Sequence, residues 1–323
     1  LSLTTLFRSK NVAFRIIGVA TTRSRGLSLG EIEKIDEAQK AIRTVVQAAQ
    51  KMAGVLLEDV LVSFSGGEPK SYGVVGTTKI SGRQVTELDI GNALRNSDIP
   101  EYGTSRDVVH ALPVNFSLDD RTGLVDPRGQ LGDELTVDLH LMTVHQSLID
   151  NIIQAIRGCH LDLAGLCFAP YLAGTSSLTE DELNLGSACI DLGADISGVT
   201  IFFKKQMIYG GSVRMGGSHI TKDIAKVFNV PFDSAERIKN LHGGLISTSR
   251  DDRDLIEAID NNQEKISISR SELIGVISPR VEEILEEVYE QLAVAGFNNI
   301  DSKKIILTGG SSQLPGLFEV ASR

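Results

Sequence analysis

The sequence predicts an α/β protein of more than one domain that carries a β-rich insertion. The first 70 residues alternate strand-like and helix-like patterns, which is typical of a sheet covered by helices. Residues 72–149 break that alternation with short β-prone pieces. Further along, two glycine pairs each follow a predicted strand, at turns where the backbone can approach a ligand closely. A chain of 323 residues also exceeds what one hydrophobic core usually fills.

The composition argues against several classes of protein. The net charge is −10, whereas nucleic-acid binders usually carry a basic patch, so no nucleic-acid partner is expected. Cys159, Cys167 and Cys189 form no CxxC pair and are odd in number, which indicates a reducing compartment rather than a disulfide framework. The histidine spacing predicts no metal cluster. No apolar run predicts a membrane span, and no signal peptide is recognised.

The first elements follow from hydrophobic periodicity. Residues 13–21 are short, apolar and β-prone, and they predict a strand. A helix is expected next, because apolar residues from Ile32 to Met52 recur at steps of three and four and Gly54 ends the run. Residues 60–65 predict a second strand, closed by two glycines.

The insertion, residues 72–149, reads as short strands around one small helix at 86–94. Val137, Leu139 and Leu141 alternate with polar residues, which predicts a half-buried strand. Turn formers between 117 and 132 predict loops. A helix over 146–157 then leads out of the insertion.

The α/β pattern resumes with strands predicted at 187–191, 198–203 and 207–214. Residues 215–300 are expected to be mainly helical, with Ser269 and Glu272 as a capping box. Pro279 predicts a kink or a restart in that last helix. Residues 304–308 predict a final strand that runs directly into Gly309 and Gly310.

The hairpin predicted around residues 189–200 has the chemistry of a phosphate site. A strand delivers Asp191 into a turn that contains Gly193. N–H groups of such a turn can bind an anion, and a carboxylate beside it can hold Mg²⁺ through water. A plain hairpin with an acidic turn explains the pattern equally well when it is taken alone.

Three further motifs suit other parts of a nucleotide. Gly216 and Gly217 open a helix after a strand, where an anion can bind. Glu236 and Lys239 share one helix face and could hold ribose hydroxyls or form a weak surface pair. Strand-ending glycines at 309–310 allow a flat ring to approach, although an ordinary strand–helix turn has the same appearance.

The order of these motifs resembles the second lobe of actin-like ATPases. The resemblance becomes specific to the bacterial cell-division protein family FtsA at residues 17–20, 24–26, 48–54, 110–116, 126–129, 218–225 and 278–283. It covers essentially the whole chain. It implies an actin-like (ribonuclease H-like) two-lobed ATPase fold with the inserted subdomain that this family calls 1C.

The resemblance also implies subdomain limits and site residues. Subdomain 1A is expected at 1–71 plus 150–173, 1C at 72–149, 2A at 174–215 plus 301–323, and 2B at 216–300. ATP is expected to contact Asp191, Gly193, Ala194, Gly216, Gly217, Glu236, Lys239, Gly309, Gly310 and Ser311. Asp191 is expected to hold Mg²⁺, and Arg280 to meet the C-terminal tail of FtsZ. No catalytic residue is implied.

The family resemblance further implies a role at the division site. The protein is expected to form filaments, to recruit later division proteins and to tether FtsZ to the cytoplasmic face of the inner membrane. The membrane contact is expected from an amphipathic helix beyond Arg323, and the first phosphate loop is expected before Leu1, so the chain reads as truncated at both ends. Ala194 and Asp195 replace glycines of the second loop, and the charge of Asp195 predicts at most weak ATPase activity.

Three other interpretations remain open from the sequence. A pilus-assembly scaffold of the PilM type shares the fold but binds a pilus peptide. A small-molecule kinase of the same superfamily needs a catalytic base, for which no candidate is found. A protein with a dead nucleotide site would act only as an interaction module.

Overall fold

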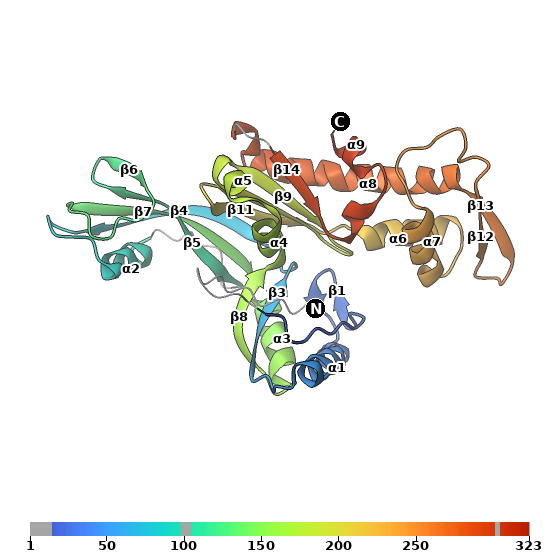
Figure 1. Cartoon of the computed structure of the whole chain (residues 1–323), viewed down its shortest axis with the longest axis horizontal. Helices are drawn as coiled ribbons and strands as arrows, with labels where there is room; N and C mark the ends of the chain where they lie inside the picture. Colours follow the sequence, from blue (N-terminus) through green and yellow to red (C-terminus); the bar gives the residue numbers. More distant parts are fainter. Residues whose placement is uncertain (1–14, 98–104, 301–303, 323) are drawn as a thin grey trace. The chain divides into compact units, whose positions relative to one another are not determined.

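The computed structural model describes residues 15–97, 105–300 and 304–322. The chain divides into two compact units (Figure 1). Unit 1 comprises Leu1–Leu172 and Phe202–Gly210, and unit 2 comprises Ala173–Ile201 and Gly211–Arg323.

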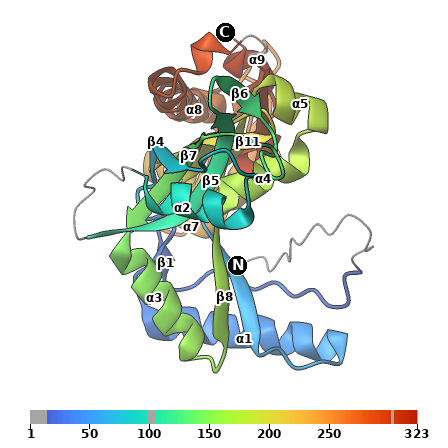
Figure 2. The same cartoon turned by 90° about the vertical axis from the view of Figure 1, so that its left-hand side faces the viewer.

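The first part of unit 1 is an α/β layer. Strands β1 (Leu27–Ser28) and β2 (Glu31–Ile32) form a small antiparallel hairpin, and β3 (Asp59–Phe64) pairs in parallel with β8 (Asp162–Phe168). Helix α1 (Ile35–Ala53) and helix α3 (Gln146–Arg157) lie side by side in both views (Figures 1 and 2). Gly54 ends α1 in the left-handed conformation, as its position in the sequence predicts.

The insertion forms a separate antiparallel sheet within unit 1. Its strand order is β4-β7-β5-β6, from β4 (Lys70–Lys79), β7 (Glu134–His145), β5 (Arg106–Leu118) and β6 (Arg121–Leu124). Helix α2 (Glu87–Arg95) packs on β4 and β7, and Thr86 and Asp89 form its capping box. Alternate residues of β7, Leu135, Val137, Leu139 and Leu141, are buried in the core beneath this helix.

A second four-stranded sheet, most of it in unit 2, has the order β11-β10-β9-β14; its residues 202–210 are counted with unit 1. The strands are β9 (Ser187–Leu192), β10 (Ser197–Phe203), β11 (Gln206–Val213) and β14 (Lys304–Thr308), and β14 runs parallel to β9. Helices α4 (Ala169–Ser177) and α5 (Glu180–Leu185) precede the sheet. A 3-10 turn, η2 (Gly310–Gln313), and helix α9 (Leu317–Ala321) follow β14.

The rest of unit 2 is mainly helical, as predicted. Helices α6 (Gly217–Val227) and α7 (Phe232–His242) pack on each other, and α6 also packs on the long helix α8 (Arg270–Val294). Figure 1 shows the hairpin of β12 (Leu255–Ile259) and β13 (Lys265–Ser269) beside α7. The turn η1 (Phe297–Asn299) follows α8. Ser269 and Glu272 form the expected capping box.

The strand predicted at residues 13–21 is wrong for its described part. Residues 15–21 have no regular structure, and residues 13 and 14 lie outside the described part of the chain. A strand needs a hydrogen-bonded neighbour, and none of the described strands pairs with this segment. Ile16, Ile17 and Val19 are accordingly exposed, so their β propensity is not supported by burial.

Two details of the helical region also differ from the predictions. The β12–β13 hairpin was missed; Ile256 and Ile268 bury one of its faces while Leu255 and Ile259 stay exposed on the other. Pro279 does not restart α8, which continues through it. Buried residues on both sides of the proline, Ile277 and Val281, stabilise the continuous helix against the loss of one backbone hydrogen bond.

Candidate functional site

The turn between β9 and β10 is tightly closed by its own backbone. The N–H of Gly193 lies 3.0 Å from the carbonyl oxygen of Asp191 and 3.1 Å from that of Ile196. A side chain at position 193 would place its Cβ 2.6 Å from the Ile196 oxygen, which is closer than real contacts allow. Glycine is therefore required here by the close approach of the backbone.

Backbone hydrogen bonds join the start of α6 to this turn. Gly217 N–H donates to the carbonyl oxygen of Gly193 at 2.9 Å, and Ser218 N–H donates to that of Ala194 at 2.7 Å. Gly216 N–H donates to His219 Nδ1 at 3.2 Å, so the histidine caps the helix. The first N–H groups of α6, which the sequence suggested for an anion, are thus used inside the protein. Only the partial positive charge of the helix end remains for a ligand.

Residues 309–311, which follow β14, lie against the same turn. Gly309 has φ +85°, and a Cβ there would lie 2.7 Å from Asp191 Oδ1 and 2.5 Å from the carbonyl oxygen of Leu192. Ser311 Oγ donates to the carbonyl oxygen of Gly193 at 3.4 Å. Gly310, in contrast, faces open space, because a Cβ built on it meets nothing within 4 Å.

Asp191 is a partly buried carboxylate with no ion pair among the described residues. Burial raises the pKa of its carboxyl above the usual range, and a hydrogen bond from Thr308 Oγ1 at 3.5 Å opposes that rise only in part. Such a carboxylate gains stability from a cation beside it. The adjacent Cys189 is fully buried, and burial raises the pKa of its thiol to about 11, so it is an inert core residue.

Glu236 and Lys239 project from α7 toward the start of α6. Lys239 Nζ donates to Glu236 Oε2 at 2.8 Å and to the carbonyl oxygen of Gly217 at 2.9 Å. Burial disfavours ionisation of Glu236, but hydrogen bonds from Lys239 and Thr221 outweigh it and lower the pKa of this carboxyl. The pair is therefore an internal part of the site rather than a weak surface pair.

Ala194 is exposed and contributes its backbone carbonyl, whereas the neighbouring Asp195 is half-buried. Burial lowers the pKa of His219, with help from Lys222 and Arg280, while the charge of Asp195 acts in the opposite direction. Asp195 thus lies within electrostatic range of the helix start that the turn contacts.

Arg280, on α8, forms hydrogen-bonded ion pairs with acidic side chains of unit 2. Its Nε donates to Asp223 Oδ2 at 2.6 Å and its Nη2 to Asp223 Oδ1 at 3.2 Å. Its Nη1 also contacts Glu283 Oε2. About a quarter of the side chain, 26%, remains accessible. These hydrogen bonds and charges raise the pKa of Arg280 further.

The structure brings the ten predicted nucleotide residues to one place in unit 2, whereas Arg280 lies on a different helix, where it pairs with α6. Sequence reasoning missed Thr221, which joins Lys239 and Glu236, and Asp223, which holds Arg280. The available signal was spacing: Thr221 stands four residues after Gly217, where a threonine hydroxyl reaches the preceding turn's carbonyl oxygen.

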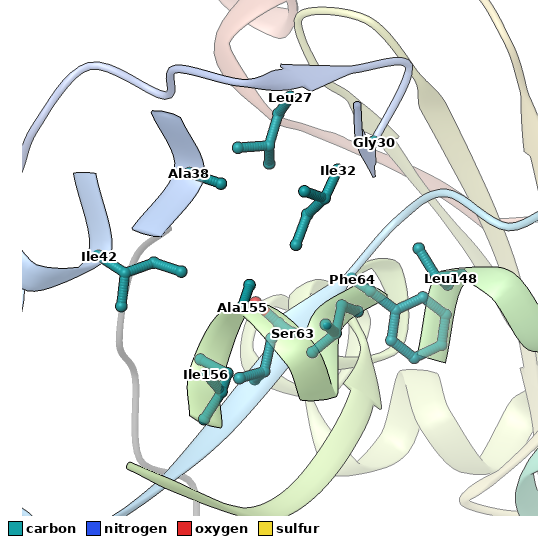
Figure 3. A pocket seen from close by; sticks show the side chains of 12 residues that line it. Leu27, Gly30, Ile32, Ala38, Ile42, Ser63, Phe64, Leu148, Ala155 and Ile156 are labelled. Carbon is teal, nitrogen blue, oxygen red and sulfur yellow. The ribbon is translucent and has the colours of Figure 1, made fainter. Parts of the chain in front are cut away.

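An apolar pocket lies in unit 1, apart from the locus around the 191–194 turn. Figure 3 shows side chains from the β1–β2 hairpin, α1, β3 and α3 around a common space. The lining is apolar apart from the Ser63 hydroxyl, and it includes Leu27, Ile42, Phe64 and Ile156. It contains no titratable group, so it offers nothing to orient a charged ligand. Nowhere in the described residues do three or more His, Cys, Asp or Glu side chains gather at a possible metal site.

Solved structures identify the fold class. The PilM–PilN type IV pilus biogenesis complex matches with a TM-score of 0.60 at 17% identity, covering 93% of this chain and 76% of that one. MreB5 of Spiroplasma citri bound to ADP matches with a TM-score of 0.51 at 16% identity, covering 91% and 69%. The chain therefore has the actin-like α/β fold, and its insertion is of the FtsA type, since residues 66–143 match the model of the SHS2 domain inserted in FtsA.

Sequence relatives identify the family. Residues 188–323 match the model of cell division protein FtsA. The FtsA of Rhizobium meliloti is 32% identical over 315 residues, 96% of this chain and 71% of the relative. The FtsA of Bacillus subtilis is 29% identical over 313 residues, 96% of this chain and 71% of the relative. The chain belongs to the FtsA family of cell division proteins. Among its described residues, every helix is too short or too polar to cross a membrane.

Proposed function

We propose that this protein binds ATP with Mg²⁺ in unit 2, self-assembles into actin-like filaments and tethers FtsZ to the cytoplasmic membrane at the division site. The observation that carries the nucleotide proposal is the convergence of four separate segments. The 191–194 turn, the start of α6, the Glu236–Lys239 pair and residues 309–311 contact one another directly or through one intermediate. Membership of the FtsA family supports the remainder.

The residues of this locus fit Mg²⁺ and a nucleotide. Mg²⁺ keeps most of its waters and needs only one or two carboxylates together with phosphate oxygens, and Asp191 supplies a carboxylate that pairs with no cationic side chain among the described residues. Bound Mg²⁺ would supply positive charge to the phosphates. A Cβ built on Gly310 would meet no described atom within 4 Å, so this backbone is open to a ligand, and we assign Gly309, Gly310 and Ser311 to the nucleoside. Glu236 and Lys239 are assigned to the ribose side.

Calorimetry on the full-length protein tests this proposal. Wild-type protein is expected to bind ATP in the presence of Mg²⁺, and Asp191→Asn is expected to weaken that binding about tenfold or more, because a charged ligand to the cation is lost. Asp181→Asn, on the exposed first turn of α5, is the matched control and is expected to leave binding unchanged. Wild-type protein that binds no ATP would instead favour a nucleotide-dead interaction module of the same fold.

ATP hydrolysis is proposed to be weak at most. No described side chain is assigned as a catalytic base. Asp195 adds negative charge close to the proposed phosphate position, and this charge costs affinity for a developing phosphate anion unless a cation compensates it.

The region around Arg280 is proposed to receive the C-terminal tail of FtsZ. Arginine binds carboxylates through two parallel hydrogen bonds, and in this structure Asp223 occupies that geometry. Carboxylates of a tail peptide would compete with Asp223 and Glu283 for the same guanidinium. Titration with a labelled tail peptide is expected to show at least a tenfold loss for Arg280→Glu and no change for Arg237→Glu, an exposed control on α7.

The wider role rests on the family. We propose that an amphipathic helix beyond Arg323 contacts the inner face of the cytoplasmic membrane and that later division proteins are recruited there. We also propose subdomain limits of 1–71 plus 150–173 for 1A, 72–149 for 1C, 174–215 plus 301–323 for 2A, and 216–300 for 2B. Light microscopy of the tagged full-length protein, with and without FtsZ depletion, tests the location.

A further inference from the structure

The side chain of His219 caps the first turn of α6. Its Nδ1 atom lies 3.2 Å from the backbone nitrogen of Gly216, the residue that precedes the helix, and accepts that N–H group. In return, the backbone N–H of His219 donates to the carbonyl oxygen of Gly216 at 3.0 Å. A glutamate or glutamine at this third helical position makes the same side-chain bond in a capping box. Here a titratable imidazole takes its place.

This hydrogen bond determines the protonation state of the imidazole ring. A backbone N–H can only donate, so Nδ1 carries a lone pair and no proton. The ring is therefore neutral, with its single proton on Nε2. An imidazolium has a proton on both nitrogens and would turn an N–H group toward the N–H of Gly216. Protonation of His219 therefore breaks the cap.

The surroundings of His219 favour the neutral ring. The side chain is half-buried, and burial lowers its pKa. The charged groups that act on the ring come from three elements: Lys222 and Asp223 from α6, Arg280 from α8, and Asp195 from the turn between β9 and β10. The two cations lower the pKa and the two carboxylates raise it, and the lowering effects are the larger.

The cap lies within the contact between α6 and the 191–194 turn. Three successive N–H groups at the start of α6 have acceptors: that of Gly216 bonds to the imidazole, and those of Gly217 and Ser218 bond to carbonyl oxygens of the turn. Gly216 is buried, and a Cβ on it would lie 2.5 Å from the Gly193 oxygen. A buried N–H without an acceptor is costly, so loss of the cap favours movement of the helix start away from the turn.

We infer that His219 is a positioning residue that makes nucleotide binding depend on pH, because its neutral ring holds the start of α6 against the 191–194 turn and its protonation releases it. The nucleotide part of this inference rests on the proposed function. ATP that binds best to the capped arrangement opposes protonation of the ring. Affinity is therefore highest above the usual histidine pKa of about 6.5 and falls as the pH drops through the lowered pKa of the folded protein.

The test measures the affinity of the full-length protein for Mg·ATP between pH 8 and pH 5.5, with circular dichroism to verify the fold at each pH. Wild-type affinity is expected to fall about fivefold toward pH 5.5, as for the loss of one backbone hydrogen bond. His219→Gln supplies an amide oxygen that does not titrate, and its affinity is expected to change less than about twofold. The two proteins share every other titrating group, including the phosphates of ATP, so the difference between their profiles belongs to His219.

Two further variants complete the comparison. His219→Ala removes the acceptor, and it is expected to bind ATP about fivefold more weakly than His219→Gln at every pH. His160→Gln, at an exposed position, is expected to keep the wild-type profile.

The possible failures are distinguishable. A His219→Gln profile as steep as that of the wild type would overturn the inference and leave nucleotide binding intact. Wild-type affinity that rises toward pH 5.5 would also overturn it, because the imidazolium would then attract the phosphates instead of releasing the helix. Wild-type protein that binds no ATP at any pH would overturn the proposed function.

A second readout needs no nucleotide and tests the cap alone. Nitrogen NMR of the ring is expected to show an unprotonated Nδ1 and a protonated Nε2 at pH 8. The amide signal of Gly216 is expected to shift with the same midpoint as the ring, below pH 6.5, and to stay constant in His219→Gln. A neutral ring with its proton on Nδ1, or a Gly216 amide that does not follow the ring, would reject the positioning role.

Discussion

Arg280 and Asp223 join α8 to α6 through two hydrogen bonds, from Nε to Oδ2 at 2.6 Å and from Nη2 to Oδ1 at 3.2 Å. Both side chains are partly buried, with 26% and 29% of their surfaces exposed. The pair therefore has two possible roles, which are to stabilise the helix contact and to hold the guanidinium ready for an outside carboxylate.

Asp223→Asn separates these two roles. We expect it to lower the free energy of unfolding by about 1 kcal/mol, because a partly exposed ion pair of good geometry is lost. We also expect it to strengthen binding of an acidic tail peptide several-fold, since Arg280 loses its internal competitor. Urea unfolding and peptide titration measure the two effects. Weaker peptide binding would contradict the role assigned to Arg280, and Glu290→Gln, an exposed α8 position, serves as control.

Gly216→Ala tests the contact between α6 and the 191–194 turn. The new Cβ would lie 2.5 Å from the Gly193 oxygen and 2.7 Å from the Ala194 oxygen, so the backbone must move. We expect a loss of about 1–3 kcal/mol in unfolding free energy, as for overpacked sites, together with weaker ATP binding.

Gly275→Ala is the matched control on α8. A Cβ there meets nothing within 4 Å, and the residue is exposed in a helix interior. This change is expected to stabilise the protein by about 0.5–1 kcal/mol through helix propensity and to leave ATP binding unchanged. Equal unfolding free energies and equal ATP affinities in the two variants would show that the close contact at Gly216 matters neither for stability nor for binding.

Arg106 joins the two chain segments that connect the insertion to the rest of unit 1. The side chain is only 7% exposed; its Nη2 donates to the carbonyl oxygens of Glu68 and Thr143, and its Nε donates to Thr143 Oγ1 at 3.0 Å. Arg106→Met removes these buried hydrogen bonds, and we expect it to cost about 2–4 kcal/mol in chemical denaturation.

Arg106→Lys is expected to recover only part of that loss, because a single ammonium cannot span the same acceptors. Arg128→Met provides the control, since its pairs with Asp126 and Glu87 are exposed, and a change below about 0.5 kcal/mol is expected. An Arg106→Met variant as stable as wild type would rule out a clamping role.

Acid should destabilise unit 1 through His140. Burial lowers the pKa of His140 to about 4, with a smaller contribution from the nearby His110. The unfolded chain therefore binds more protons than the native state between pH 6.5 and 4. Stability from the neutral imidazole is complete above pH 6.5 and is lost as the pH falls, by up to about 3 kcal/mol.

His140→Gln should flatten the dependence of unfolding free energy on pH in this window, measured by urea titrations from pH 4.5 to 7. His110 is also buried with a lowered pKa, so a smaller slope is expected to remain. His160→Gln, at an exposed position, should retain the wild-type slope. An unchanged slope in His140→Gln would contradict the assignment.

Periodicity and capping were sufficient to predict much of the fold. The helix at 146–157 follows from its apolar stripe, and the helix after residue 32 follows from a stripe that stops at Gly54. The strand predicted at 13–21 failed because β propensity is realised only when a neighbouring strand accepts its hydrogen bonds. The β12–β13 hairpin was missed because Leu255 and Ile259 on its exposed face are as apolar as the buried Ile256, so no clear alternation of apolar and polar residues marks β12.

The candidate site was predictable as an ordered set of motifs but not as a network. Spacing alone placed Glu236 and Lys239 on one face. It could not show that a threonine fifteen residues earlier satisfies both of them, because α6 and α7 meet only through tertiary packing. Nor could it show that the first N–H groups of α6 bond to the 191–194 turn. The roles of the site residues toward ATP and Mg²⁺, and the role of Arg280 toward FtsZ, stay predictions.

The hydrogen bonds from Gly217 to Gly193 and from Ser218 to Ala194 hold the 191–194 turn and the start of α6 in one fixed arrangement, although the two segments are separate in the sequence. A chimera that exchanges the 191–197 turn with that of another family member must therefore exchange residues 216–219 as well, since the carbonyl positions of one determine the start of the other. The exchangeable module of this site is a pair of segments separated by a hairpin, and grafts of either segment alone should fold poorly.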